Sequence, residues 1–438
     1  MRAPHEPELV QDRAVQPDLG KLPPLQDAPK RVGVLLTEFP NQTSVAMWRV
    51  AVAMRQLGRT VSVVSTRRND QPGKFDRTFG QDISDAFYAW PPQIGSALSC
   101  CLSQPGKVVQ CLRYIASLRD EPIRGRLKLV LMILGSASLS RFCRQRDIQH
   151  LVVHSMANAA HLVTMAKLLG GPRFSLRLGG DLEVYGGDHP QKTQHADLII
   201  AAAENNRQQV IQELKISPDR VMQSSLGVDT QRFTPPADRA ALQTPVRLLT
   251  VARLNKTKGH AFAIEAIALL RDRGIECSYT LYGEGPYRSA IEDQIRSLDL
   301  QQQVKLAGVA DEATVIESLR QADLFLLPSV GLGEATPVSV LEAMSCGLPA
   351  IVSRIGGTPD IIDSWHDGVI VPQADSTAIA ESIERLVSDP ALHTQMADAA
   401  RQRAVNSFDS RQVAAKLLHR IASVSDADRP SQDSSPVQ

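Results

Sequence analysis

Short apolar runs that alternate with helical segments constrain the fold of this chain more than any other feature of its sequence. The first run, RVGVLL at residues 31–36, has no alternation of polar and apolar positions, which is typical of a strand buried on both faces of a parallel sheet. A helix is expected over residues 46–57, Gly58 ends it, and the run TVSVVST follows. This strand–helix–strand unit predicts a parallel α/β architecture.

The alternation forms two series along the chain. The first continues through HLVVHS, FSLRLGG and DLIIAAA, and the loop-like segment LGVDTQRFTPPAD ends it. The second begins with VRLLTVARL and continues through SYTLYG, VKLAG, LFLLPS and LPAIVS. Because 438 residues exceed what one hydrophobic core usually organises, we expect two Rossmann-like domains that meet near residue 240. Ligands of such domains bind at the carboxyl ends of the strands, so we expect the site in the cleft between them.

The expected organisation has five parts. Residues 1–29 form a polar lead that lacks the apolar core of a secretory signal, and we expect it to be disordered. The first domain is expected over residues 30–238 and the second over residues 239–405. A helix over residues 406–424 is expected to return toward the first domain, and the polar tail, residues 425–438, to be disordered.

Composition excludes several classes of protein. The 48 basic residues balance the 47 acidic ones, so bulk charge gives no reason to expect a nucleic-acid partner. The six cysteines show no CxxC spacing, and we expect them to be reduced thiols of a cytoplasmic protein. No run approaches the roughly 20 apolar residues that a transmembrane helix needs, and the strongest candidate is LVLMILG at residues 129–135.

Two cations and two carboxylates stand at strand ends and helix starts of the second series. Arg253 follows its first strand, and Lys258 lies just before an expected helix. Glu334 and Glu342 flank the expected start of another helix at Pro337. Free backbone N–H groups and the positive end of that helix dipole would favour a diphosphate. Taken alone, solvated cations and glutamates that stabilise a helix dipole explain the same residues equally well.

Six motifs in order resemble a known family, the retaining GT-B-fold glycosyltransferases of glycosyltransferase family 4. They are VARLNKTKGH, LYGEGPYR, ADLFLLPS, the segment with two glutamates, GLPAIVSRIGGTPDII and HDGVIVP. The resemblance covers roughly residues 31–420, and LGVDTQRFTP is similar to the interdomain segment, with Leu226 where Asn is usual. It implies the GT-B arrangement, in which two Rossmann-like domains face each other across a cleft. The first would bind the acceptor and the second the nucleotide sugar.

The resemblance also implies roles for the second-domain residues. Arg253 and Lys258 would neutralise the departing nucleoside diphosphate in place of a metal ion, so neither a metal nor a cofactor is expected beyond the nucleoside diphosphate sugar as co-substrate. Glu334 would contact the transferred sugar, and Glu342 the ribose. The other residues expected to bind the donor are Gly283, Glu284, Gly285, Pro286, Ala335, Thr336, Pro337 and Val338.

The first domain departs from the family at one motif. Members carry His-Gly-x-Asp at a strand end, but here SLRLGGDLEVY places Asp181 at the Asp and Leu178 at the His. Arg177 is the nearest polar residue, and His154 matches a family position on a preceding strand end. His154, Arg177 and Asp181 are therefore the candidates for acceptor or auxiliary roles, although a core or capping role also explains His154. A retaining transfer can proceed without the histidine, because a leaving-group oxygen can take the acceptor proton.

Two first-domain segments indicate a setting. FPNQTS at residues 39–44 resembles a segment of exopolysaccharide transferases of the colanic-acid type, whose acceptors are lipid-linked oligosaccharides at the inner face of the membrane. Residues 103–150 carry nine Lys or Arg against three acidic residues. These helices would either contact an anionic membrane peripherally or pack on the sheet with their charges toward water.

The expected function is therefore transfer of a sugar from a nucleoside diphosphate to a hydroxyl of a glycan or lipid-linked oligosaccharide, in bacterial surface polysaccharide biosynthesis. The absence of the motif histidine leaves a second hypothesis, a non-catalytic scaffold subunit that binds nucleotide sugars. A nucleotide-sugar epimerase of the same fold is a third.

Overall fold

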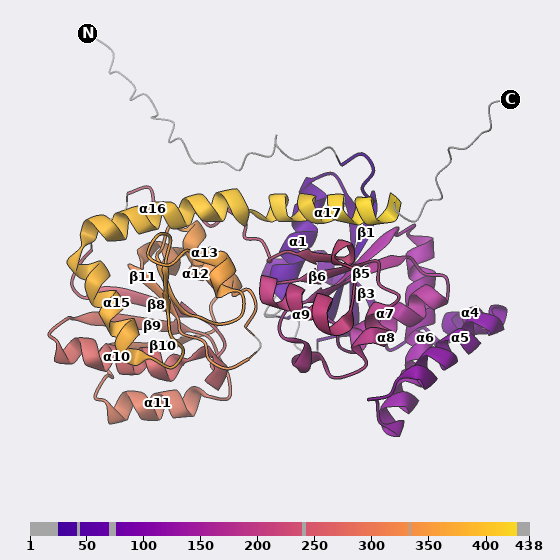
Figure 1. Cartoon of the computed structure of the whole chain (residues 1–438), viewed down its shortest axis with the longest axis horizontal. Helices are drawn as coiled ribbons and strands as arrows, with labels where there is room; N and C mark the ends of the chain where they lie inside the picture. The colour runs from indigo at the N-terminus through magenta and orange to yellow at the C-terminus, as the bar shows by residue number, and fades with distance from the viewer. Residues whose placement is uncertain (1–24, 42–43, 70–75, 239–241, 333, 427–438) are drawn as a thin grey trace, which may run out of the picture.

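The computed structural model describes residues 25–41, 44–69, 76–238, 242–332 and 334–426, and Figure 1 shows two lobes joined side by side. In the first lobe the strands are β1 (Arg31–Phe39), β2 (Thr60–Arg68), β3 (Phe87–Trp90), β4 (His150–Val153), β5 (Arg173–Leu178), β6 (Leu198–Ala201) and β7 (Val221–Gln223). Its helices are α1 (Val45–Gln56), α2 (Asp76–Phe79), α3 (Asp82–Asp85), α4 (Ile94–Ser103), α5 (Pro105–Ser117), α6 (Ile123–Gln145), α7 (Asn158–Leu168), α8 (His189–Thr193) and α9 (Glu204–Leu214).

The second lobe repeats the same plan. Its strands are β8 (Val246–Val251), β9 (Cys277–Tyr282), β10 (Val304–Gly308), β11 (Leu324–Leu327), β12 (Ala350–Ser353) and β13 (Val369–Val371). Its helices are α10 (His260–Asp272), α11 (Arg288–Ser297), α12 (Glu312–Gln321), α13 (Val338–Ser345), α14 (Thr358–Ile361), α15 (Ser376–Ser388) and α16 (Pro390–Ser407), and α17 (Ser410–Asp426) ends the described chain.

Both sheets are parallel and share one topology. The first has the order β3-β2-β1-β4-β5-β6-β7 and the second the order β10-β9-β8-β11-β12-β13. In each, the first strand of the domain lies between its second and fourth strands, so the order reverses there. Such a reversal leaves a crevice at the carboxyl ends of the strands, where ligands of open α/β sheets bind. The expected two-domain α/β fold is confirmed.

Two strands of the first sheet, β3 and β7, are not predicted by the apolar runs. Both lie at the edges of the sheet and are short. In β3, Phe87 and Ala89 are buried whereas Trp90 is exposed, so the strand alternates instead of reading as a continuous apolar run. Edge strands are often exposed on one face and then alternate between apolar and polar residues. A search for continuous apolar runs, which are typical of strands buried on both faces, therefore misses them.

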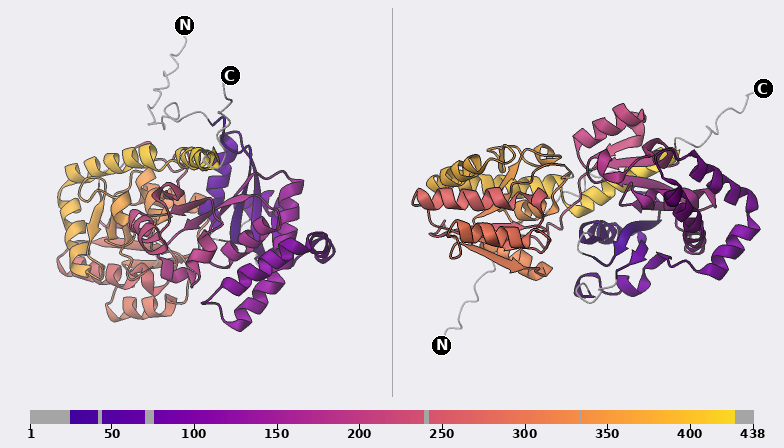
Figure 2. Two further views of the ribbon diagram at one scale, coloured as in Figure 1. Left: turned by 45° about the vertical axis from the view of Figure 1, so that its right-hand side comes forward. Right: turned by 90° about the horizontal axis from the view of Figure 1, so that it is seen from below.

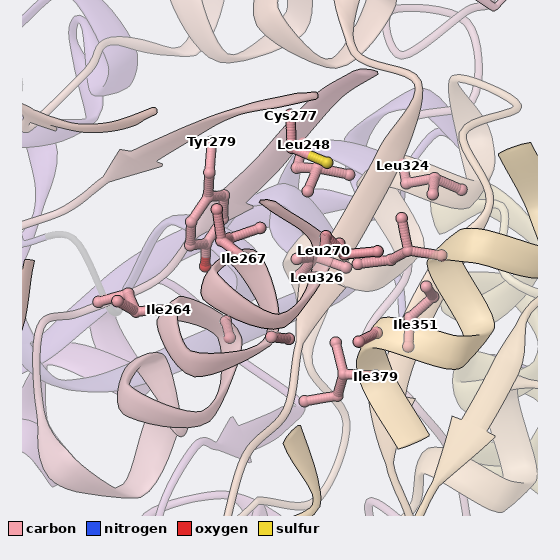
Figure 3. Close-up of a cluster of buried hydrophobic side chains, with 14 of the residues drawn as sticks. Leu248, Ile264, Ile267, Leu270, Cys277, Tyr279, Leu324, Leu326, Ile351 and Ile379 are labelled. Carbon is pink, nitrogen blue, oxygen red and sulfur yellow. The ribbon is translucent and has the colours of Figure 1, made fainter. Parts of the chain in front are cut away.

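The core of the second domain lies between its sheet and the covering helices (Figure 3). Leu248 and Leu326 from the strands pack against Ile264, Ile267 and Leu270 of α10. Each such fully buried side chain contributes roughly 1.5–3 kcal/mol of transfer free energy. These contacts fix the strand ends that carry the candidate site.

The last helix returns to the first domain. Ala414, Leu417 and Ile421 of α17 join the apolar core that α1 forms with the first sheet, and Figures 1 and 2 show α16 and α17 crossing from one lobe to the other. Where the chain crosses, the Val228 N–H donates to Phe408 O (2.8 Å) and the Ser410 N–H donates to Val228 O (2.9 Å). The two connections between the domains are thus hydrogen-bonded to each other.

The chain termini extend the expected boundaries slightly. The expectation that residues 1–29 are disordered is wrong for residues 25–29, which the structure describes. Ala28 is buried there in the apolar core beside α1. The rest of that lead, residues 1–24, and the tail residues 427–438 lie outside the described residues. All six cysteines are free. Within the described ranges, no helix is both long enough and apolar enough to cross a membrane.

Candidate functional site

The cation pair of the second domain lies at the end of β8, beside the end of β11. Lys258 and Arg253 line a cavity of 220 Å³ together with Glu334 and the first residues of α13. Gly259, at φ +68°, allows this approach, because a Cβ there would lie 1.7 Å from Pro328 O. The His260 side chain holds the loop between β8 and α10 through a hydrogen bond of 3.0 Å between its Nε2 and Arg253 O.

Lys258 and Glu334 form an ion pair with each other in this structure. The Glu334 carboxylate also accepts a hydrogen bond from Ser329 Oγ at 2.9 Å, and its side chain is only 10% exposed. Arg253 is exposed and makes no ion pair within the described part of the chain. The cavity therefore holds one paired cation and one unpaired cation.

The loop before α13 is supported by two glycines that sequence reasoning did not single out. A Cβ on Gly356 would lie 1.5 Å from Glu334 O, and one on Gly357 would lie 2.4 Å from Ala335 O. The Gly357 N–H donates to Ala335 O at 2.8 Å, and Ala335 itself is buried. The Gly-Gly pair in RIGGTPD is the signal that could have identified this support.

The first turn of α13 faces the same cavity. Thr336, Pro337, Val338 and Ser339 all line it, and no side chain caps the helix start at Pro337. Its free backbone N–H groups and the helix dipole favour an anion there. Thr336 Oγ1 also donates to Ala202 O of the first domain at 3.0 Å, so this turn lies at the domain interface.

Glu342 lies one turn further into α13 and is paired across the interface. Its carboxylate accepts a hydrogen bond of 2.5 Å from Arg49 of α1, and Arg49 also donates to Glu312 at 2.7 Å. All three side chains are between 10% and 13% exposed. Sequence reasoning missed Arg49 and Glu312, although a single arginine within the apolar run VAMWRVAVAM of α1 was a usable signal.

Burial and ion pairing have opposing effects on the pKa values of Glu342 and Arg49. Burial raises the pKa of the Glu342 carboxyl, and the adjacent Arg49 guanidinium opposes that rise. Burial alone would lower the pKa of Arg49, but Glu342 and Glu312 outweigh it, so the pKa of Arg49 is raised. The arginine therefore stays charged and is the main factor favouring the ionised form of Glu342.

A second cavity of 630 Å³ lies between the domains beside this cluster. Val45, Ala46 and Arg49 of α1 form one wall, and residues around Glu312 and Glu342 form the other. It shares Val251, Val338 and Ser339 with the smaller cavity. The two cavities therefore adjoin and together form a trough: Arg253, Lys258 and Glu334 line its smaller part, and the larger part has mostly apolar walls beside the Arg49 cluster.

The glycine-rich turn after β9 packs against the end of β8. A Cβ on Gly283 would lie 1.9 Å from Ala252 O, and one on Gly285 would lie 2.2 Å from Leu254 O. Glu284 is exposed and pairs with Arg288 at 2.6 Å. Neither cavity is lined by the segment from Gly283 to Pro286. In this structure the turn positions the strand end that carries Arg253.

The first-domain candidates lie apart from these cavities. Leu178, at the place of the family's histidine, is fully buried in the core. Arg177 is 3% exposed and donates to Ser224 O at 2.6 Å, and Asp181 accepts a hydrogen bond from Asn206 at 3.3 Å. Burial lowers the pKa of Arg177 to about 10. None of these residues lines either cavity.

His154 is a neutral imidazole at neutral pH. Burial first, and the nearby Arg177 guanidinium second, lower the pKa of His154 to about 3. Its buried Nδ1 has no hydrogen-bond partner among the described residues. A group with this pKa is a weak general base near neutral pH.

Comparison with known proteins identifies the family and the fold of this chain. The family model for glycosyl transferases group 1 matches residues 235–403. The amylovoran biosynthesis glycosyltransferase AmsK of Erwinia amylovora is 30% identical over 310 residues, which cover 67% of this chain and 75% of AmsK. WcaL of Escherichia coli strain K12, which is assigned to colanic acid biosynthesis, is 31% identical over 46% of this chain and 50% of its own length.

Solved structures share the arrangement of the two domains. Anabaena Alr3699/HepE in complex with UDP has a TM-score of 0.69 at 15% identity and covers 90% of this chain and 100% of its own. Sucrose-phosphate synthase of Thermosynechococcus elongatus has a TM-score of 0.70 at 15% identity, with 91% of this chain covered and 100% of its own. The chain has the GT-B fold and belongs to the group 1 glycosyltransferases.

Proposed function

We propose that this glycosyltransferase moves a sugar from a nucleoside diphosphate to a hydroxyl of a glycan or lipid-linked oligosaccharide, with retention at the anomeric carbon. The observation that carries the proposal is the trough between the domains, in which Lys258, Glu334 and the open first turn of α13 surround one cavity. Relatives named for amylovoran and colanic acid biosynthesis support bacterial surface polysaccharide as the product class.

The donor would lie along the trough with its charges at the small cavity. Its diphosphate would bind at the first turn of α13, where Arg253 is already unpaired and exposed. The nucleobase of the donor would occupy the larger cavity, whose walls are mostly apolar. The UDP complex of Alr3699/HepE supports a nucleotide ligand for this fold.

Donor binding would exchange two ion pairs for ligand contacts. Lys258 would leave Glu334 for the diphosphate, which frees the Glu334 carboxylate to accept hydrogen bonds from the transferred sugar. Ribose hydroxyls would replace Arg49 at Glu342. Because Arg49 belongs to the first domain, this second exchange would also release an interdomain contact and let the cleft adjust around the donor.

The transfer step requires only these groups and the substrates. The bond between the anomeric carbon and the β-phosphate oxygen breaks, and a bond from the acceptor oxygen to the same face of that carbon forms. The acceptor proton passes to a leaving-group phosphate oxygen, so the buried Leu178 and the weakly basic His154 do not prevent turnover. Arg253 and Lys258 would stabilise the departing diphosphate without a metal ion or another cofactor.

The setting follows from the acceptor class. A lipid-linked acceptor would bring the enzyme to a membrane surface, and we assign it to the cytoplasmic side as a peripheral protein. The basic first-domain segment supports this assignment.

The proposal is tested by turnover with UDP-, GDP- and ADP-sugars in the presence of a chelator, with a membrane extract as acceptor. Extract-dependent release of nucleoside diphosphate, and a product whose anomeric configuration by NMR matches that of the donor, are the expected results. An inverted product would exclude retention. Donor binding without release under any acceptor would favour the scaffold hypothesis, and an epimerised sugar formed without acceptor would favour the epimerase.

A further inference from the structure

Exposed apolar side chains gather on one part of the first domain. Among the described residues, thirteen large apolar side chains are exposed, and ten of them lie between Trp90 and Leu131. Scattered single exposures are normal on a protein surface, but such a concentration marks a contact surface. The segment comprises the end of β3, the helices α4 and α5, and the first half of α6.

The exposed residues form stripes at helical spacing. On α4, Ile94, Leu98 and Leu102 follow one another four residues apart and are 62%, 46% and 80% exposed. On α6, Ile123 and Leu127 are 79% and 62% exposed, and Val130 and Leu131 extend the same face. Each helix thus presents a continuous apolar stripe to its surroundings.

The opposite sides of the same helices are already used for packing. Ala97 and Cys100 of α4 join Cys111 and Tyr114 of α5 and Leu129 of α6 in a small core of their own. A continuous apolar stripe on a surface helix normally faces a protein core, a partner or a membrane. Packing on the sheet and on one another leaves the outer stripes of α4 and α6 uncovered.

The surface around the stripes is strongly basic. Residues 94–146 contain nine Lys or Arg and two acidic residues. Arg113, Arg124 and Lys128 are exposed beside the apolar stripes. One of the two acids, Asp120, is exposed, and its Oδ2 accepts a hydrogen bond from the Asp188 N–H at 2.8 Å. The net charge of the surface is thus positive.

The surface lies at the free end of the first domain. Figure 1 shows α4, α5 and α6 on the side of the first lobe away from the second lobe, and the right view of Figure 2 agrees. The turn between α5 and α6 is held to the domain, because Asp188 accepts hydrogen bonds from the N–H groups of Arg119 (2.7 Å), Asp120 and Glu121. The three helices are therefore a fixed part of the domain that projects outward.

We propose that α4, α5 and α6 form a membrane-docking surface that inserts the stripes of α4 and α6 shallowly into an anionic bilayer. Apolar side chains would enter the boundary of the acyl chains while the surrounding cations contact anionic headgroups. Trp90, 47% exposed beside the start of α4, would sit at headgroup level, where tryptophan is favoured. A second copy of the chain is a poorer occupant, because it would oppose one basic surface with another.

The docking surface deepens the proposed function and rests on its assignment to a membrane surface, because it names the helices that would make the contact. Vesicle binding is measured with neither donor nor acceptor present, so a failure to dock and a failure to transfer sugar are distinguishable. The test uses the full chain with vesicles of phosphatidylglycerol and phosphatidylcholine, and with vesicles of phosphatidylcholine alone. Co-sedimentation is expected with the anionic vesicles and at least about tenfold weaker with the neutral ones.

Matched substitutions identify the surface. The double variant Leu98→Ser/Leu102→Ser and the double variant Leu127→Ser/Leu131→Ser are each expected to weaken vesicle affinity about tenfold or more. Val184→Ser is the control, because Val184 is 53% exposed in the same domain but outside the stripes. Lys128→Glu is expected to weaken binding, whereas Lys416→Glu on the exposed side of α17 is not. An unchanged Tm excludes loss of the fold in each variant.

Tryptophan fluorescence measures insertion directly. Anionic vesicles are expected to shift the emission of Trp90 to shorter wavelength, and Trp90→Phe to remove that shift while co-sedimentation remains. The chain contains only two other tryptophans, Trp48 and Trp365, and both are partly buried. Absence of vesicle binding by the wild type would overturn the proposal. So would a dimer that the stripe substitutions dissociate while vesicle binding is absent, since the stripes would then face a second copy.

Discussion

The two domains share one topology but differ in what their strand ends hold. In the second domain the ends of β8 and β11 carry Arg253, Lys258 and Glu334 around an open cavity. In the first domain the end of β5 carries Leu178 in the core and Arg177 bonded to a backbone carbonyl. The same sheet topology thus has charged side chains around a cavity at its strand ends in one domain and packed side chains there in the other.

Because of this difference, the charged groups proposed to act on the donor come mainly from the second domain. Among the described residues, Arg49 is the one charged side chain that the first sheet and its helices contribute to the trough, and it pairs with two second-domain carboxylates, of which Glu312 is also paired with Arg232. The other distinctive feature of the first domain, the stripes of α4 and α6, lies at the opposite end of the domain. We infer that donor chemistry depends on the second domain, whereas the first domain controls access and location.

Substitution of Lys258 is the strongest way to test this asymmetry. Lys258→Ala is expected to lower the rate of transfer about 100-fold or more, because it removes a cation at the departing diphosphate. Release of nucleoside diphosphate with a membrane extract as acceptor measures the effect. Lys256→Ala is the matched control, because Lys256 is exposed in the same short helical turn and does not line the cavity. Equal losses in both variants would contradict the assignment.

Removal of Arg49 tests the one charged contribution of the first domain. Arg49→Ala leaves Glu342 and Glu312 without their shared cation at a site about 10% exposed, so we expect a loss of about 3 kcal/mol in the free energy of unfolding. Chemical denaturation measures it. Arg49→Met combined with Glu342→Gln should lose less, because no isolated buried charge remains at Glu342. A double variant as unstable as the single one would argue against the ion pair.

The stability of the Arg49→Ala variant is expected to depend on pH. The pKa of Glu342 is already raised by burial, and loss of Arg49 would raise it further. A carboxyl whose pKa is raised on folding contributes most to stability when it is protonated, and that contribution is lost as pH rises through its folded pKa. The stability difference between Arg49→Ala and the wild type should therefore be larger at pH 8 than at pH 5. A difference that shrinks as pH rises would contradict the explanation.

Substitution of His154 should have the smallest effect. With a pKa of about 3, this imidazole stays neutral near neutral pH, and it lines neither cavity. We expect His154→Gln to change the rate of transfer by less than about threefold and to leave its pH profile unchanged. Loss of an inflection from that profile would show that His154 acts as a base, and the contrast between the domains would weaken.

The sequence predicted the parts of this molecule that depend on local pattern. Continuous apolar runs located the central strands of both sheets, and the ordered motifs predicted Arg253, Lys258 and Glu334, which line one cavity, and Glu342, which lines the adjoining one. The sequence did not predict the partners of these groups. Arg49 and Glu342 are 293 residues apart, and their contact depends on how the two domains pack. The sequence also did not predict the exposed apolar stripes of α4 and α6, because apolar residues in a helix do not show which of them the rest of the protein covers.

The glycine-rich turn shows a further limit of sequence reasoning. A Gly-x-Gly-Pro motif suggests close approach to a ligand, yet in this structure Gly283 and Gly285 approach the backbone of Ala252 and Leu254. Both arrangements need a position without a Cβ, so the motif alone does not distinguish them. The distinction required the relative positions of the ends of β8 and β9, which pair in the sheet and are separated in the chain by α10.

Donor binding tests the central claim most directly. Isothermal titration of the full chain with UDP-, GDP- and ADP-sugars in the presence of a chelator should show one class of donor that binds at a single site. Its affinity should fall at least about tenfold in Lys258→Ala and in Glu342→Gln, because each substitution removes one of the proposed donor contacts. If none of these donors binds, or if binding is unchanged in both variants, the donor site does not lie between Arg253 and Glu342.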